Sequence, residues 1–229
     1  MKLRCEQLEM HFFRKTGDAN FFVAVAPLSL SLPEAALTVL MGRSGSGKTT
    51  LMNMLSGLLR PTSGRVFLGE DELYAMDDRT LSRYRNRHIA VIPQGQSALP
   101  QLSVMENVLL PGMIYEKDRR QDAERRREAA EMLEQLGLGA LLDVSPRELS
   151  GGELRRLSIA RALLMHPDVL CCDEPTADLD DENTRVVLDI LKKTAGDGCT
   201  VFMVTHEEDA VHYADRLYRM QSGQVTEEK

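Results

Sequence analysis

Hydrophobic positions in the first 60 residues predict strands that lead into a short helix. Apolar and polar side chains alternate from residue 8 to residue 12, which predicts a strand with one buried face. A looser alternation follows over residues 23–32. The run Leu37–Met41 is apolar apart from Thr38, as expected of a strand buried on both faces of a parallel sheet. It leads into a glycine-rich loop, after which residues 49–59 are predicted to be a helix.

The remainder of the chain predicts a helical middle and a return to strands. Residues 117–137 mix alanine, leucine and methionine with many arginines and glutamates, which favours an amphipathic helix with a solvated charged face. A second helix is predicted over residues 153–165. Apolar runs at 169–172 and 200–205 predict strands, and each follows a stretch of helical pattern. This order favours a mostly parallel sheet flanked by helices, with a helical insertion in the middle.

Composition narrows the class of protein. The 229 residues are 43% hydrophobic and 28% charged with a net charge of −7, which fits a globular protein and disfavours general nucleic-acid binding. The sequence has no run of roughly 20 apolar residues that could cross a bilayer, and residues 1–20 lack the apolar stretch of a signal peptide. Four cysteines without metal-binding spacing suit a reducing cytosol. We therefore expect a cytoplasmic protein that only another subunit would hold at a membrane.

The loop after the predicted strand at 37–41 matches the pattern G-x-x-x-x-G-K-[ST]. Its glycines let the backbone fold tightly with N–H groups pointing inward, and the next helix directs its positive N-terminus at an anion. Lys48 is expected to reach the β- and γ-phosphates of a nucleotide, and the Thr49 hydroxyl to bind Mg²⁺. Chance is a poor alternative, since these four specified positions recur in roughly one per cent of chains this long. The expected phosphate-binding residues are Gly42, Arg43, Ser44, Gly45, Ser46, Gly47, Lys48, Thr49 and Thr50.

Two carboxylates follow the apolar run at 169–172. Asp173 would lie at the carboxyl end of a buried strand, where ligands gather in parallel sheets, and would there hold Mg²⁺ directly or through water. Glu174 would orient or deprotonate an attacking water. The alternative is that Asp173 and Glu174 only begin a loop before Pro175.

The run Leu149-Ser150-Gly151-Gly152-Glu153 has two interpretations. Ser150 and Glu153, three residues apart, form the pattern of a capping box that starts a helix. Two glycines at a helix start nevertheless reduce helix stability, and they leave backbone N–H groups open to an anion. Because the phosphate loop already supplies one cradle, the expected anion is the γ-phosphate of ATP held by a second copy or a partner.

Six elements in this order make the sequence resemble the nucleotide-binding subunits of ABC transporters over essentially its whole length. The resemblance implies one ABC ATPase domain with a P-loop NTPase (RecA-like) α/β core, a mostly parallel sheet and an N-terminal antiparallel β subdomain, formed by residues 1–93 and 166–229. A helical subdomain that carries the signature is implied at about 94–165. The six elements are the phosphate loop, Gln94 after Val91-Ile92-Pro93, the signature at 149–153, Asp173-Glu174, the loop Ala177-Asp178-Leu179-Asp180, and His206.

The resemblance also implies roles for residues of the ATP site. Gln94 would complete the Mg²⁺ shell formed with Thr49 and Asp173 and would sense a membrane partner. Glu174 would be the catalytic carboxylate, acting with Lys48, and His206 would contact the γ-phosphate. The signature, Ser150, Gly151, Gly152 and Glu153, would cap ATP across a head-to-tail dimer, with Asp178 and Asp180 at its interface.

An aromatic ring from the first strand is implied to stack on adenine. Phe12 fits the family pattern best and Phe13 second, unless both rings pack in the strand core. The signature ends in Glu153 where many relatives have glutamine, and Pro93 stands where an aromatic often precedes the glutamine. Neither departure removes a catalytic group, so we expect an active site.

As a whole, the resemblance implies an ATPase that binds ATP and Mg²⁺, works as a homodimer or paired cassette, and moves an integral-membrane permease from the inner face of the cell membrane. The signature and residues 106–111 look most like the lipoprotein-release, macrolide-export and peptide-antibiotic-resistance branch. A cell-division-type regulatory cassette that signals across the membrane without transport has the same motifs and stays open. A soluble cassette protein acting on DNA or ribosomes is disfavoured by the acidic charge and by the lack of a long coiled-coil insertion.

Overall fold

The computed structural model describes residues 1–13, 21–95, 97–115 and 122–229. Its larger sheet has six strands, of which five run parallel and the edge strand β10 runs antiparallel to β9. The strands in spatial order are β10 (Gln224–Glu227), β9 (Arg216–Gln221), β3 (Leu37–Met41), β8 (Thr200–Thr205), β7 (Val169–Asp173) and β6 (Ile89–Ile92).

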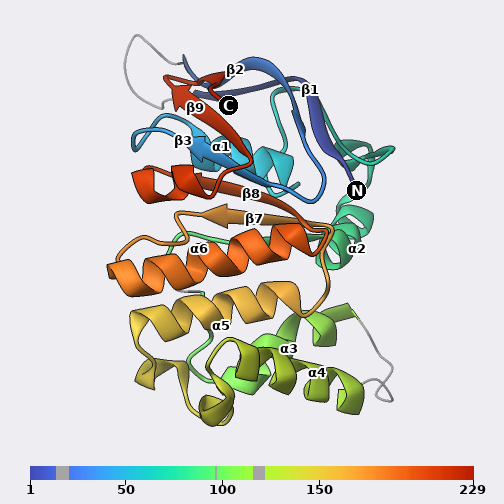
Figure 1. The fold of residues 1–229 in the computed structure, drawn as a ribbon. Helices are drawn as coiled ribbons and strands as arrows, with labels where there is room; N and C mark the ends of the chain where they lie inside the picture. The colour runs from blue at the N-terminus through green and yellow to red at the C-terminus, as the bar shows by residue number, and fades with distance from the viewer. Residues whose placement is uncertain (14–20, 96, 116–121) are drawn as a thin grey trace.

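Helices cover both faces of this sheet, and the apolar runs of the sequence explain why (Figure 1). All residues of β3, β7 and β8 are buried. Successive residues of β3 enter different cores: Leu40 joins the cluster formed with α1 (Lys48–Leu55), whereas Val39 joins the cluster formed with α6 (Asp181–Gly196). The central strands are therefore apolar along most of their length, as predicted, and the polar exceptions Thr38, Asp173, Thr200 and Thr205 are buried as well.

A smaller antiparallel sheet packs over α1 and supplies much of the same core. Its order is β2 (Phe21–Leu32), β1 (Leu3–Phe13), β4 (Ser63–Leu68) and β5 (Asp71–Glu72). The pairing register of β1 shifts between Cys5 and Leu8, where Gln7 has a positive φ of 47°. This bulge is one residue that simple alternation does not predict.

Three helices pack around a third hydrophobic cluster below the large sheet in Figure 1. They are α3 (Val104–Tyr115), α4 (Asp122–Gln135) and α5 (Gly151–Leu163). The side chain of Asn107, which is fully buried, ties the preceding loop to α3 by donating to the carbonyl oxygens of Leu99, Leu102 and Ser103. The mostly parallel sheet, the antiparallel β subdomain and the helical insertion confirm the predicted fold class.

Several predicted helix limits are wrong by a few residues. The first helix ends at Leu55 and not at residue 59, because Gly57 has a φ of 74° that an α-helix does not accommodate. Helix α5 starts two residues early, at Gly151, and ends at Leu163 rather than 165. Of the helix expected at 117–137, residues 117–121 lie outside the described part and the helix ends at Gln135.

The described residues also form elements that no pattern above predicted. One is α2 (Asp78–His88), capped by the Asp77 side chain, which accepts from the N–H of Thr80 at 2.7 Å. Short 3₁₀ turns occupy Leu73–Ala75, Gly139–Leu141, Pro146–Glu148 and Glu208–His212. Within the described ranges, none of the helices combines the length and the apolar character needed to span a membrane.

Candidate functional site

The glycine-rich loop connects the carboxyl end of β3 to the N-terminus of α1. Gly47 is the N-cap residue of α1 with a φ of 109°, and no described side chain caps this helix end. A Cβ at Gly47 would lie 2.2 Å from the carbonyl oxygen of Ala24 in β2, so only glycine allows this close approach. The first N–H groups of α1 therefore have no side-chain cap, which is compatible with the predicted anion site.

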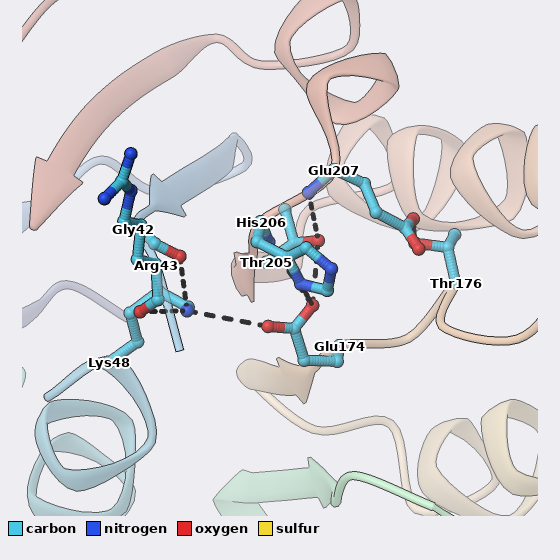
Figure 2. Close-up of polar contacts among 8 residues, drawn as sticks. All are labelled: Gly42, Arg43, Lys48, Glu174, Thr176, Thr205, His206 and Glu207. Carbon is cyan, nitrogen blue, oxygen red and sulfur yellow. Dashed lines mark hydrogen bonds and ion pairs between the residues drawn. The ribbon is translucent and has the colours of Figure 1, made fainter. Parts of the chain in front are cut away.

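Lys48 lies folded over this loop with its side chain only 4% exposed. Its ammonium donates to the carbonyl oxygen of Gly42 at 2.6 Å and to that of Arg43 at 3.3 Å. The same Nζ lies 3.5 Å from Oε1 of Glu174 (Figure 2). A buried cation is thereby placed at the centre of the loop with a carboxylate facing it.

Asp173 ends β7 beside this lysine and is 2% exposed. Burial raises the pKa of its carboxyl, while a hydrogen bond from Thr49 and the charge of Lys48 oppose the rise. Its Oδ1 is buried and has no hydrogen-bond partner among the described residues. An unpaired buried carboxylate oxygen next to a threonine hydroxyl is a donor set that suits a hard cation such as Mg²⁺.

Glu174 is held in an unusual backbone conformation, with a φ of 47°. Such a conformation in a residue other than glycine is uncommon and marks a position that its surroundings enforce. Three contacts fix one oxygen, Oε2: the Thr205 hydroxyl at 3.1 Å, the His206 backbone N–H at 3.3 Å and His206 Nδ1 at 2.9 Å. The other oxygen, Oε1, faces Lys48 and the phosphate loop (Figure 2).

A cavity of about 450 Å³ extends from the loop to the antiparallel sheet. Phe12 and Phe22 line its far end and stack with centroids 5.6 Å apart at 28°. Phe13 is 78% exposed and is absent from the lining, so Phe12 is the ring that the cavity presents. The other lining residues are Val23, Ala24, Ser44, Gly45, Ser46, Gly47, Lys48, Thr49, Thr50, Gln94, Glu174, Ser222 and Gly223.

The signature lies elsewhere on the chain. Ser150 caps α5 in a complete capping box: its Oγ accepts from Glu153 N–H at 3.3 Å, and the Glu153 carboxylate accepts from Ser150 N–H at 2.7 Å. Gly151 is exposed, and none of the described residues 150–153 lines the phosphate-loop cavity. Gly151 and Asp178 line a separate, smaller hollow, and Asp180 caps α6 by accepting from Asn183 N–H at 2.8 Å.

One chain therefore brings together Phe12, most of the phosphate loop, Glu174 and Gln94, with Asp173 attached through Thr49 and His206 through Glu174, but not the signature or Asp178. Sequence reasoning missed Phe22 at the far end and Thr205 beside Glu174. It also missed Gly223, whose N–H donates to the Ser46 carbonyl at 3.0 Å and ties the loop to the turn after β9. Only the position of Thr205 directly before His206 offered a signal.

Comparison with known proteins places this geometry in a family. The family model described as ABC transporter matches residues 25–177. The lipoprotein-releasing system ATP-binding protein LolD of Aquifex aeolicus is 39% identical over 88% of this chain and 88% of its own length. The macrolide export ATP-binding/permease protein MacB of Rhodopirellula baltica is 39% identical over 93% of this chain, which spans only 31% of that protein.

Solved structures agree. The dimeric ABC transporter cassette MJ0796 matches with a TM-score of 0.90 and 31% identity, over 99% of this chain and 98% of that one. The same cassette in a post-hydrolysis state with ADP and phosphate matches with a TM-score of 0.86 and 30% identity, over the same shares of the two chains. The chain therefore belongs to the ABC transporter family, as an ATP-binding and ATP-hydrolysing cassette.

Proposed function

We propose that two copies of this cassette, or this cassette and a paired one, bind two ATP molecules head to tail. Each site would combine the phosphate loop of one chain with Ser150, Gly151, Gly152 and Glu153 of the other, with Asp178 and Asp180 at the interface. The observation that carries the proposal is that the phosphate-loop cavity contains no described signature residue, while Ser150 and Gly151 stand exposed at the N-terminus of α5. The capping box uses the N–H groups of Ser150 and Glu153 but not those of Gly151 and Gly152, which favour an anion supplied from outside the chain.

Within each site the chain's own residues would position the nucleotide and a water. Lys48 and the loop N–H groups would bind the phosphates of ATP, with Ser44 and Thr50 lining the cavity and Arg43 outside its lining, on the neighbouring hollow beside β9. Thr49, Asp173 and Gln94 would hold Mg²⁺, which neutralises phosphate charge when bound. Glu174 would orient or deprotonate the attacking water through Oε1, the oxygen that faces Lys48. His206, with 61% of its side chain exposed, would contact the γ-phosphate.

The aromatic end of the cavity would bind adenine, with Phe12 as the platform. Its ring already stacks on Phe22, so the base would extend an existing aromatic stack. Phe12→Ala should weaken binding of ATP roughly 5- to 100-fold, as expected for loss of one stacking partner, and leave binding of inorganic triphosphate unchanged. Equal weakening of both ligands would remove Phe12 from the base-binding role, and Phe13→Ala is the matched control.

The partner would be an integral-membrane permease, and the chain would work at the inner face of the cell membrane. Support comes from relatives named as ATP-binding components of lipoprotein release and macrolide export, the latter with a permease in the same polypeptide. ATP-driven pairing would move residues 94–165, the proposed helical subdomain, against the core of residues 1–93 and 166–229. Copurification with a permease tests this partnership, and copurification with ribosomes or DNA would contradict it.

The shared site is tested by the dependence of ATP hydrolysis on protein concentration. Starting from verified monomer, the rate per subunit should rise with concentration, because each site needs two chains. Glu174→Gln should bind ATP, nearly stop hydrolysis and accumulate as an ATP-dependent dimer. A rate per subunit that is flat with concentration would contradict the shared site, and robust hydrolysis by Glu174→Gln would remove Glu174 from catalysis.

A further inference from the structure

Glu174 is held by a closed chain of contacts that joins the segment after β7 to the segment after β8. The Thr205 side chain, fully buried at the end of β8, lies at the centre of this chain. Its hydroxyl meets Oε2 of Glu174 at 3.1 Å on one side and the backbone N–H of Glu207 at 3.1 Å on the other. The carboxylate of Glu207 in turn accepts a hydrogen bond from the Thr176 hydroxyl, two residues after Glu174 (Figure 2).

The directions of these hydrogen bonds determine which groups the Thr205 hydroxyl accepts from and donates to. A hydroxyl has a single proton and accepts through its lone pairs. The N–H of Glu207 can only donate, so it takes a lone pair of Thr205 Oγ1. The Thr205 proton is then free to point at the Glu174 carboxylate, which in its ionised form can only accept.

The two oxygens of the Glu174 carboxylate therefore have different contacts. Oε2 accepts from Thr205 and contacts His206, while Oε1 faces Lys48 at 3.5 Å. Rotation of the carboxyl group about its last bond is broad in an unrestrained glutamate. The contacts that Thr205 and His206 make with Oε2 restrict that rotation and keep Oε1 on the side of the phosphate loop.

We propose that Thr205 is a positioning residue for hydrolysis, which holds the Glu174 carboxylate so that Oε1 faces the water that attacks ATP. Glu207 and Thr176 support it by fixing the hydroxyl's orientation and the turn that carries it. The inference rests on the proposed role of Glu174. It assigns Thr205 no contact with nucleotide, since Thr205 is absent from the lining of the phosphate-loop cavity.

The test compares three variants at a protein concentration high enough for two chains to pair, in the presence of Mg²⁺ and saturating ATP. Thr205→Val removes only the hydroxyl and keeps the β-branched shape, and Thr205→Ser keeps the hydroxyl. Thr200→Val is the matched control, because Thr200 starts the same strand, is fully buried, and has a hydroxyl without a hydrogen-bond partner among the described residues.

We expect kcat of Thr205→Val to fall roughly 10- to 100-fold, in the range expected for one hydrogen bond to a charged group. The Kd for ATP and the ATP-dependent dimer should stay within about twofold of wild type, because the residue touches neither, whereas a loss of general integrity would move them with kcat. Thr205→Ser should restore most of the rate, and Thr200→Val should leave kcat and Kd unchanged.

Two results would overturn the inference: a Thr205→Val rate equal to that of Thr200→Val, or equal losses in Thr205→Val and Thr205→Ser. Its failure is distinguishable from failure of the proposed function. If Glu174→Gln is inactive while Thr205→Val is not, only the positioning role is lost, whereas an active Glu174→Gln removes both. Adding Thr205→Val to Glu174→Gln should cost nothing further, because the group that it positions is already gone.

Discussion

The two glycines of the signature should respond in opposite ways to the same substitution. A Cβ at Gly152 would lie 2.2 Å from Oδ1 of Asn183 and 2.6 Å from its Cγ, whereas at Gly151 the nearest atom outside the local chain is 3.9 Å away, on Leu179. Both positions lie in the first turn of α5. We therefore expect Gly152→Ala to destabilise the chain and Gly151→Ala to be tolerated.

The magnitude follows from what holds Asn183. Its Oδ1 accepts from Arg156 at 2.9 Å, and its Nδ2 donates to both carboxylate oxygens of Asp180, at 3.0 and 3.1 Å. Moving it for a methyl at Gly152 breaks hydrogen bonds to charged groups, each worth about 1.5–3 kcal/mol when well formed. Replacing glycine by alanine in a helix returns about 1 kcal/mol. With one of these hydrogen bonds lost, the net loss for Gly152→Ala should be about 0.5–2 kcal/mol, against a gain of up to about 1 kcal/mol for Gly151→Ala.

Urea denaturation of both variants at pH 7 without nucleotide measures the difference between their free energies of unfolding, which should be about 0.5–3 kcal/mol. Gly151→Ala then separates stability from function. It should bind ATP as a monomer like wild type, yet hydrolyse it roughly tenfold or more slowly at high protein concentration, because its methyl lies where the partner's phosphate would approach. The steric reasoning is refuted if Gly152→Ala is as stable as Gly151→Ala.

Three further outcomes are expected. Because burial raises the pKa of Asp173, its ionised form at pH 7 destabilises the nucleotide-free chain, so Asp173→Asn should melt no lower than wild type. The same variant should lose about 100-fold or more in Mg²⁺-dependent hydrolysis, and a clearly lower melting temperature would contradict the reasoning on burial. Hydrogen bonds from Ser150 lower the pKa of Glu153, so the stability that Glu153 contributes is present above its unfolded-state pKa and disappears as the pH falls through its folded-state pKa. Glu153→Ala should therefore cost about 1 kcal/mol at pH 7, and the difference in free energy of unfolding between variant and wild type, measured by urea denaturation, should vanish towards pH 3. Burial raises the pKa of Cys199 to about 11 and that of Cys171 to about 12, so a thiol reagent at pH 8 should label the native chain slowly. The labelling rate should rise about tenfold for each unit of increase in pH, and all four cysteines should react quickly only in urea, so fast labelling of the native chain would refute the burial.

Sequence reasoning was strongest where one physical cause acts locally. A strand buried on both faces is apolar at most of its positions, so β3, β7 and β8 were predicted close to their ends. Helix α3 was missed because its own residues are apolar on nearly all sides, which removes the amphipathic period, and because it contains Pro111. The end of α1 was missed because Gly57 stops the helix through its backbone conformation, and composition alone does not reveal that conformation.

Contacts between distant segments were the part that no local pattern could supply. The choice between Phe12 and Phe13 depends on which face of β1 the cavity occupies, and that is set by pairing with Phe22 and Phe21 across the strand pair. Thr205 lies 31 positions from Glu174, so their hydrogen bond exists only once β7 and β8 have paired. Residues of this kind become visible only when strand order is known.

Helix α5 connects the exposed signature at its N-terminus to the segment that carries Gln94. Two arginines of this helix, the buried Arg155 and the half-buried Arg161, hold both ends of the segment after β6: Arg155 donates to the Pro93 carbonyl at 3.5 Å, and Arg161 to the Ser97 carbonyl at 2.7 Å. Burial lowers the pKa of both arginines, so each cation depends on these few partners and is costly to detach. Gln94, which lines the phosphate-loop cavity, lies between the two anchors. Under the proposed head-to-tail pairing, a partner's nucleotide that displaces the signature should move the segment that carries Gln94 through these two contacts, which would couple the two nucleotide sites.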